Sequence, residues 1–284
     1  MRVLILGATG MLGSTLLRLF HVHPGIEVFG TVRSPSAREL LPHEVHAQLV
    51  IGVDVENNEH LLRLMARVRP DAVVNCIGLV KQLSESELPL AAIPINALLP
   101  HRLAEICGLF GARLIHISTD CVFSGRKGLY TETDFADADD LYGRSKYLGE
   151  VDYPHAVTLR TSIIGHELNG SRSLVCWFLA QHGQVSGFRR ATFSGLPTVE
   201  LGRVILEHVL PNTDLHGLYH VSAEPINKFD LLALIAQHYG KNINIIPEDD
   251  FFIDRSLDSS RFRQATGFQP KAWDQLVQSM KEFG

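Results

Sequence analysis

The sequence lacks the patterns by which several classes of protein are recognised. Its four cysteines, Cys76, Cys107, Cys121 and Cys176, lie far apart and form no CxxC pair. This spacing is too sparse for a disulfide framework and does not fit a zinc site. There is also no HExxH motif and no Cys/His cluster, so we predict no metal site.

Long apolar runs and basic clusters are missing as well. No apolar stretch reaches the roughly 20 residues that cross a bilayer, and glycines interrupt the first apolar run before any small-residue cleavage site. The net charge is −5 and no Lys/Arg cluster suggests a nucleic-acid surface. We therefore expect a cytoplasmic protein that binds neither nucleic acid nor membrane.

The first half of the chain alternates strand-like and helix-like segments, with turn residues between them. Nearly continuous apolar strands that alternate with helices indicate a parallel sheet covered on both faces, the Rossmann-type doubly wound α/β fold. We predict strands over 2–6, 27–32, 50–55, 72–77, 113–117 and 156–160, and helices over 11–20, 59–68, 95–108 and 142–151.

After residue 160 this rhythm loosens into a stretch rich in Gly, Ser and Arg, followed by a predicted helix over 203–210 and strand over 217–221. We therefore expect a dinucleotide-binding domain over 1–165, to which 201–224 returns. A smaller substrate-binding lobe would comprise 166–200 and 225–284.

The stretch LILGATGMLG ends the first predicted strand and opens the first predicted helix. Its glycines Gly7, Gly10 and Gly13 allow a tight turn, a close approach of the backbone to a pyrophosphate, and close packing of helix on strand. The amides of the helix N-terminus would point at the phosphates. We predict that Gly7, Thr9, Gly10, Met11, Leu12 and Gly13 bind a dinucleotide.

The end of the second predicted strand decides between NAD and NADP. NAD sites carry an acidic residue there, which binds the ribose 2′-hydroxyl, but the segment FGTVRS has none. Arg33 could instead pair with a 2′-phosphate, with Thr31 or Ser34 adding a hydroxyl. The sequence therefore favours NADP(H).

Two further stretches, HISTDCVFSG and YGRSK, carry the residues suited to catalysis. Tyr142 and Lys146 are four residues apart on a predicted helix and so share one face. A phenol is a poor acid at neutral pH unless a cation stabilises its phenolate, which Lys146 is placed to do. Ser118 or Thr119, at a neighbouring strand end, could hydrogen-bond a carbonyl oxygen.

These motifs together resemble those of the extended short-chain dehydrogenases/reductases, and more closely those of the dTDP-4-dehydrorhamnose reductase family. The resemblance covers nearly the whole chain. It is carried by GATGMLG, GVDVEN, VNCIG, PINALLPHRLAEIC, HISTDCVFSG, GLYTETD, LYGRSKYLGE, LRTSIIG, SGLPT and SLDSSRFRQATGFQPKAW.

The resemblance implies a role for each matching residue. Tyr142 would be the proton donor, Lys146 its pKa-lowering partner, and Thr119 the hydroxyl that polarises the carbonyl. NADPH would be the cofactor and a nucleotide-linked deoxysugar the substrate. Asp54 and Val55 would flank the adenine, Cys76, Ile77 and Gly78 would line the cofactor, Asn96 would be a buried amide near the lysine, and Asp120, Cys121, Ser194, Pro197 and Thr198 would lie at the substrate.

Other functions compatible with these motifs remain open. Related dehydratases use an Asp-Glu pair after the threonine, but here Asp120 is followed by Cys121, where rhamnose-pathway reductases usually have tyrosine. An epimerase would retain NAD, which fits poorly with Arg33. Some relatives keep the fold only to bind and regulate a partner enzyme. The sequence leaves the nucleotide, the sugar and the oligomeric state open, a homodimer included.

Overall fold

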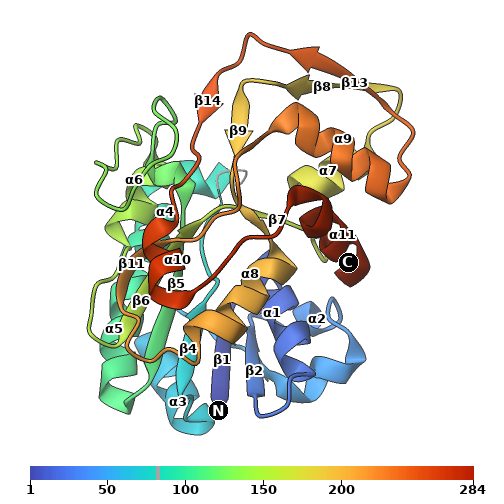
Figure 1. Cartoon of the computed structure of the whole chain (residues 1–284). Helices are drawn as coiled ribbons and strands as arrows, with labels where there is room; N and C mark the ends of the chain where they lie inside the picture. Colours follow the sequence, from blue (N-terminus) through green and yellow to red (C-terminus); the bar gives the residue numbers. More distant parts are fainter. Residues whose placement is uncertain (81–83) are drawn as a thin grey trace.

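A seven-stranded parallel sheet forms the centre of the computed structural model, which describes residues 1–80 and 84–284 (Figure 1). Its strands run in the spatial order β11-β6-β5-β4-β1-β2-β3, and neighbouring strands all pair in parallel. This order confirms the doubly wound α/β fold. The strands are β1 (Arg2–Leu6), β2 (Glu27–Val32), β3 (Leu49–Ile51), β4 (Ala72–Asn75), β5 (Arg113–Thr119), β6 (Ala156–Thr161) and β11 (Gly217–His220).

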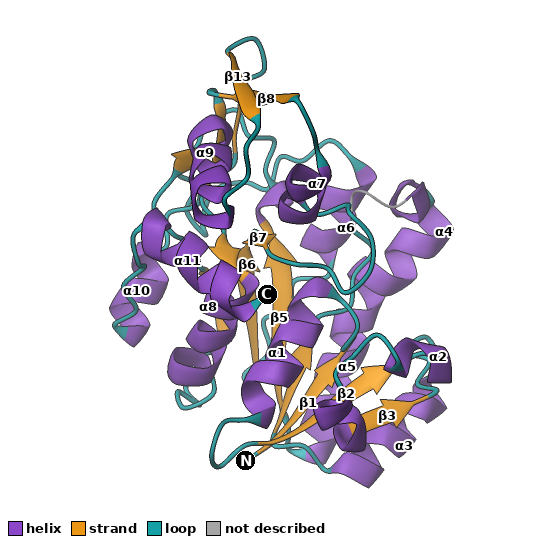
Figure 2. Ribbon diagram, turned by 90° about the vertical axis from the view of Figure 1, so that its right-hand side faces the viewer, coloured by secondary structure: helices purple, strands orange, loops and turns teal. Residues whose placement is uncertain are grey.

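Side chains alternate between the two faces of the sheet, and both faces are covered by helices (Figure 2). On β1, Val3 and Ile5 join one core cluster, whereas Leu4 and Leu6 join the other. The first cluster includes residues of α1 (Met11–His21), α8 (Thr198–Val204), α10 (Ser260–Thr266) and α11 (Trp273–Phe283), and the second includes residues of α3 (Asn58–Val68) and α5 (Leu99–Phe110).

The third strand is shorter than the predicted 50–55, because it ends at Ile51. Gly52 follows with φ +82°, a left-handed conformation that stops the extended backbone. Residues 53–57 then form the turn that leads into α3.

The helix predicted over 95–108 has two parts. It begins as a π-helical segment, η3 (Ile93–Leu98), and continues as α5. Pro100 has no N–H, so the carbonyl of Asn96, four residues earlier, has no α-helical donor. Wider turns are a common response to such a gap and occur often at functional sites.

The helix predicted over 203–210 begins earlier, at Thr198, and passes into a π-helical segment, η5 (Ile205–Val209). Gly202 reads as a break in the sequence, but it lies inside the helix against α1. A Cβ at Gly202 would stand 2.9 Å from Leu19 Cδ2 and 3.2 Å from Leu16 Cδ2. The glycine therefore serves close helix packing.

A third core cluster joins α7 (Leu174–Ala180), β8 (Gln184–Phe188), α9 (Lys228–Tyr239) and part of α11. In Figure 1 these elements and their strands lie above the carboxyl ends of the central strands. The small strands here are β7 (Ile163–Ile164), β9 (Ala191–Phe193), β10 (Leu196–Pro197), β12 (Ile226–Asn227), β13 (Asn244–Glu248) and β14 (Ile253–Asp254).

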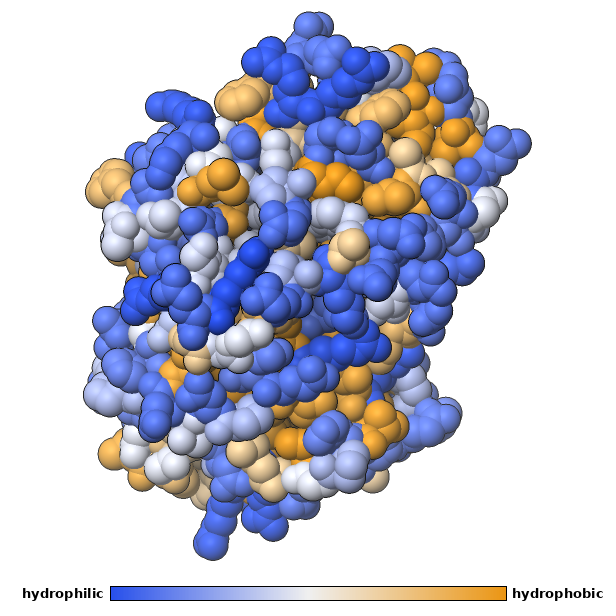
Figure 3. Space-filling view, in the orientation of Figure 1, coloured by the Kyte–Doolittle hydropathy of each residue, from blue (hydrophilic) through white to orange (hydrophobic). Residues whose placement is uncertain are grey.

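The face of the molecule seen in Figure 3 is mostly hydrophilic, with apolar side chains in small groups. No helix in the described part of the chain is long and apolar enough to span a membrane. The remaining elements are α2 (Pro35–Arg38), η1 (His43–Gln48), η2 (Ser84–Glu87), α4 (Pro89–Ala92), η4 (Asp120–Val122) and α6 (Leu141–Leu148).

Candidate active site

The glycine turn has the shape of a phosphate cradle. Gly7 directly follows β1 with φ +85°, and its amide donates to Thr31 Oγ1 at 3.1 Å. A Cβ on Gly13 would collide with the Gly7 carbonyl, so only glycine lets α1 pack this close to the strand end. Gly10 caps α1 without a side-chain hydrogen bond. The first amides of α1 are therefore available to an anion.

The other predicted members of this turn differ in what they offer to a ligand. Thr9 and Met11 are half-buried, and Gly10 is exposed. Leu12 is buried in the first core cluster, so only its backbone could face a cofactor.

We call the residues at the end of β2, Arg33 and Ser34, the β2 edge. Arg33 is exposed, and within the described residues its side chain has no hydrogen bond or ion pair. Ser34 caps α2 by accepting from the Ala37 amide at 3.3 Å. Thr31, the other hydroxyl suggested for this site, is buried and already accepts from Gly7.

The predicted adenine and cofactor-lining residues lie on the loops after β3 and β4. Asp54 is exposed and accepts from the Glu56 amide at 3.0 Å, whereas Val55 packs in the second core cluster. Cys76, Ile77 and Gly78 directly follow β4 and are half-buried. Burial raises the pKa of the Cys76 thiol to about 12, so this thiol stays neutral.

Thr119, Tyr142 and Lys146 lie together where β5 ends beside α6, and we call them the reaction floor. The Tyr142 hydroxyl lies close enough to the Thr119 side chain for the latter to lower its pKa. Burial raises the pKa of Tyr142 and the nearby Cys121 raises it further, whereas Thr119 opposes both effects. Lys146 donates from Nζ to the Ile117 carbonyl at 2.8 Å, and burial lowers its pKa to about 8.

Asn96 fixes the backbone around the reaction floor. Its Oδ1 accepts from the Leu79 amide at 2.9 Å, and its Nδ2 donates to Leu79 O and Ser145 Oγ, both at 3.2 Å. A Cβ at Gly78 would lie 3.4 Å from Asn96 Oδ1 and 3.8 Å from Lys146 Nζ. The loop after β4 is thus tied to α6, with the lysine close by.

Beside the reaction floor lies a polar group that spans both halves of the chain. Asp120 is buried, which raises the pKa of its carboxyl, while the charge of Arg255 opposes that rise. Arg255 donates to the Phe123 carbonyl at 2.7 Å and reaches Cys121 Sγ at 3.7 Å. Lys228 is close enough for the Asp120 charge to favour its protonated form. No motif in the sequence marks Lys228 or Arg255.

The predicted substrate residues of the SGLPT segment have buried side chains with partners inside the protein. Ser194 Oγ accepts from the Leu257 amide at 3.0 Å. Thr198 Oγ1 accepts from Thr15 Oγ1 at 3.0 Å, between α8 and α1. Pro197 belongs to β10, which pairs with β7. In the described part of the chain, neither hydroxyl forms a hydrogen bond with Thr119, Tyr142 or Lys146.

Behind the reaction floor lies a buried polar network that sequence reasoning missed. Glu150 forms an ion pair with Arg160, and Arg160 contacts His220. Glu150 stands in the quoted LYGRSKYLGE motif and Arg160, on β6, in the quoted LRTSIIG motif, whereas His220, on β11, lies in none of the quoted motifs. Only the fold brings them together.

Among the described residues, no group of three or more His, Cys, Asp or Glu could hold a metal ion.

The chain is similar to one protein family and to relatives that bear two different names. The model of the family described as RmlD substrate binding domain matches residues 1–283. The chain is 26% identical to a dTDP-4-dehydrorhamnose reductase from Aggregatibacter actinomycetemcomitans, over 99% of each chain. It is 29% identical to methionine adenosyltransferase 2 subunit beta from Danio rerio, over 84% of this chain and 74% of that protein.

The fold is similar to that of a dTDP-4-dehydrorhamnose reductase from Bacillus anthracis, whose structure was solved in complex with NADP. The TM-score is 0.79 at 23% identity, and the match covers 99% of this chain and 98% of that one. This likeness supports the Rossmann-type architecture.

Proposed function

Because the chain belongs to the RmlD substrate-binding-domain family, we propose that it is an NADPH-dependent reductase of the keto group of a nucleotide-linked deoxysugar. The observation that carries this proposal is the placement of Thr119 at the end of β5 beside α6, which carries Tyr142 and the buried Lys146. The relative from Aggregatibacter actinomycetemcomitans, matched over almost its whole length, bears the name of such a reductase.

The glycine turn fits a dinucleotide. Gly7 and Gly13 leave no room for a Cβ, and Gly10 leaves the α1 amides without a side-chain cap, as a bound pyrophosphate requires. Arg33 would pair with the 2′-phosphate, while Asp54, Val55, Cys76, Ile77, Gly78 and Asn96 would surround the rest of the cofactor. NADPH, when bound, supplies the hydride for the keto carbon.

In this proposal the reaction floor handles the proton. Thr119 and Tyr142 would hydrogen-bond the keto oxygen, and Tyr142 would give it a proton. The raised pKa of Tyr142 keeps the phenol protonated before reaction. In the proposed mechanism, a charged Lys146 would reduce the energy needed to form the phenolate. Asp120, Cys121 and the SGLPT residues would then orient the sugar.

The same proposal assigns the cofactor and the substrate to different parts of the chain. Residues 1–165 and 201–224 would bind the cofactor, and residues 166–200 and 225–284 would form the substrate lobe. We further propose that the protein acts in the cytoplasm, on a nucleotide sugar.

A regulatory role is the second candidate, because the chain also resembles a methionine adenosyltransferase subunit. The two roles separate in one experiment: NADPH absorbance is followed with a panel of nucleotide-linked 4-keto sugars. Steady oxidation with one of them supports the reductase. NADPH binding without turnover across the panel contradicts the reductase and supports the regulator.

A further inference from the structure

The ion pair behind the reaction floor has a fixed geometry. Arg160 donates from Nε to Glu150 Oε1 and from Nη2 to Glu150 Oε2, both at 2.6 Å. Ser118 Oγ donates to the same Oε1 at 2.7 Å. The Arg160 and Glu150 side chains are only 3% and 9% exposed. A bidentate pair at this depth holds both partners in one orientation.

His220 extends this pair to the loop that lies over it. Its Nδ1 lies 2.9 Å from the Tyr130 carbonyl, and because a carbonyl only accepts, Nδ1 carries the proton. Its Nε2 then accepts from Arg160 Nη1 at 3.3 Å. Burial lowers the pKa of His220 to about 3, so the ring is neutral and adds no charge to the network.

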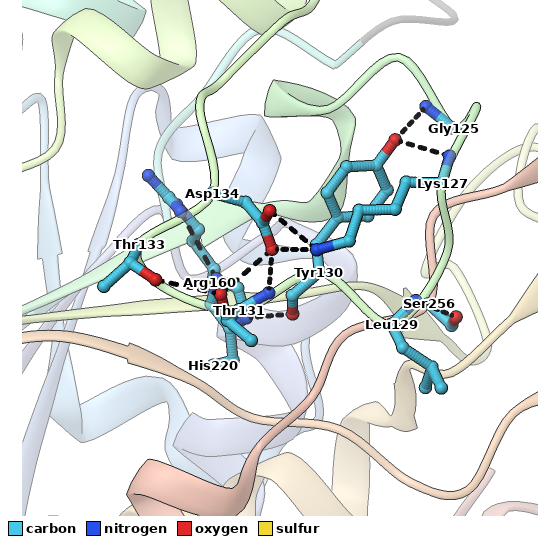
Figure 4. Close-up of polar contacts among 10 residues, drawn as sticks. All are labelled: Gly125, Lys127, Leu129, Tyr130, Thr131, Thr133, Asp134, Arg160, His220 and Ser256. Carbon is cyan, nitrogen blue, oxygen red and sulfur yellow. Dashed lines mark hydrogen bonds and ion pairs between the residues drawn. The ribbon is translucent and has the colours of Figure 1, made fainter.

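Figure 4 shows how the loop itself is held. The Tyr130 hydroxyl accepts from the amides of Gly125 and Lys127 at 3.2 and 3.1 Å, and Asp134 accepts from Lys127 Nζ at 2.6 Å. Leu129 is bonded through its amide to Ser256 Oγ at 2.8 Å. Arg160 is therefore anchored from both sides.

Glu150 stands four residues after Lys146, just beyond the end of α6. Gly149, between them, lies against the Asn96 carbonyl so closely that a Cβ would collide with it. This is the carbonyl that the π-helical segment leaves without an α-helical donor. The close contact fixes the chain direction by which Glu150 turns toward Arg160.

The groups that act on the Lys146 ammonium come from several elements. Cys76 after β4 and His116 on β5 are both kept neutral, chiefly by burial. Burial also disfavours the charged form of Lys146, whereas Glu150 favours it. Among the described groups that act on Lys146, Glu150 supplies the counter-charge.

We propose that Glu150 is a positioning residue that keeps Lys146 charged for the reaction, and that Arg160 holds Glu150 in place for this task. The inference rests on the proposed reductase chemistry for its purpose. The effect of Glu150 on the titration of Lys146 can be measured without any reaction.

The direct test is NMR titration of Lys146 in the protein labelled with 13C-lysine, without cofactor or sugar. The Lys146→Met variant assigns the resonance. In Glu150→Gln we expect the titration midpoint of Lys146 to fall by about 1 pH unit, the low end of the shift that a nearby opposite charge produces, because both Glu150 oxygens are also bonded to Arg160. An unchanged midpoint overturns the proposal, whether or not the protein proves to be a reductase.

Glu150→Gln leaves the Arg160 charge buried and unpaired, which threatens folding. The double variant Glu150→Gln/Arg160→Met removes both charges and should recover thermal stability. The Lys146 midpoint should stay low in the double variant, since the counter-charge is still missing. Recovery of the native midpoint together with stability would show a purely structural role and overturn the proposal.

Glu200→Gln is the matched control. Glu200 is a second buried carboxylate, held by Arg203 and by Lys271 at 3.0 Å, in the packing of α8. Its loss should lower stability and leave the Lys146 midpoint unchanged. If turnover of a keto sugar is found, the high-pH limb of kcat should move down with the midpoint in Glu150→Gln and stay in place in the control.

Discussion

The reaction floor and the β2 edge both lie at the carboxyl ends of strands in the central sheet. They differ in how far neighbouring groups hold their side chains. Thr119 and Lys146 are buried with partners inside the protein, and Tyr142 lies beside Thr119. Arg33 at the β2 edge is exposed, and its side chain has no partner among the described residues. One region is preorganised, and the other leaves its charge available to a ligand.

The difference follows from what each region is proposed to do. Groups that move a proton must stand in the correct geometry before the substrate arrives, so neighbouring side chains hold them. A guanidinium that reads a 2′-phosphate needs only reach and charge, and its hydrogen bonds form when the ligand binds. Changes at the reaction floor should therefore affect rate, and changes at the β2 edge should affect cofactor affinity.

Tyr142→Phe should give the largest effect. It removes the proposed acid and little else, so we expect hydride transfer to slow by about 10²–10⁴-fold while NADPH binding stays nearly unchanged. Single-turnover oxidation of bound NADPH measures the rate of hydride transfer, and a fluorescence titration measures NADPH binding. Tyr147→Phe, an exposed tyrosine on the same helix, is the matched control. Turnover within a fewfold of the parent would remove Tyr142 from the role of acid.

Arg33→Ala should give the next largest effect, and on affinity alone. A charge-assisted contact contributes about 1.5–3 kcal/mol, so NADPH should bind roughly ten- to a hundredfold more weakly. NADH has no 2′-phosphate, and its dissociation constant should not change. Arg63→Ala removes an arginine whose side chain is 73% exposed and should change neither constant. Equal losses for both cofactors, or no loss for NADPH, would show that Arg33 is only a surface residue.

This comparison also explains how far the sequence could be interpreted. The bounds of β1 and β2, the glycine turn and the Tyr142–Lys146 spacing are local patterns, and the structure has the strands and the turn where they were predicted. The Glu150–Arg160–His220 network joins the segment after α6 to two strands, β6 and β11, that are neighbours only in the folded sheet. The earlier start of α8 was hidden because Gly202 serves packing against α1 and does not end a helix.

The SGLPT segment shows the opposite limit. A resemblance assigns residues to a substrate region, but it does not distinguish side chains that face a ligand from those that hold the backbone. Ser194 and Thr198 have their hydroxyls committed to Leu257 and Thr15. The contribution of this segment to substrate binding stays a prediction.

Through His220, the buried network should also make the stability of the folded protein depend on pH, whereas the β2 edge should not. His220 has a folded pKa of about 3, below its usual value of 6.5. The unfolded chain therefore binds a proton more readily, and stability is lost as the pH falls from about 6.5 toward the folded pKa.

His220→Asn should reduce this loss. A neutral amide can replace the bond to Tyr130 without titrating, so the fall in unfolding free energy between pH 6.5 and 4 should shrink by on the order of 1–2 kcal/mol. Urea unfolding at several pH values measures it. Arg33→Ala, at the β2 edge, should keep the parent's pH dependence. The same slope in all three proteins would mean that His220 does not contribute to acid sensitivity.

The smallest effect is expected at Cys121, which borders the reaction floor and is not proposed to touch the reacting atoms. Elimination of water from a nucleotide-linked hexose needs an acid and a base beside the threonine, and here a thiol follows Asp120. A thiol is a weak hydrogen-bond donor and acceptor, so Cys121→Ser should change kcat/KM for reduction by no more than about threefold, or some 0.6 kcal/mol.

Neither the parent nor Cys121→Ser should form a product lighter by one water when incubated with NAD and dTDP-glucose or UDP-N-acetylglucosamine, as mass spectrometry can check. Detection of that product with the parent would mean that Asp120 performs elimination without a carboxylate beside it, and a dehydratase would then replace the reductase as the leading function.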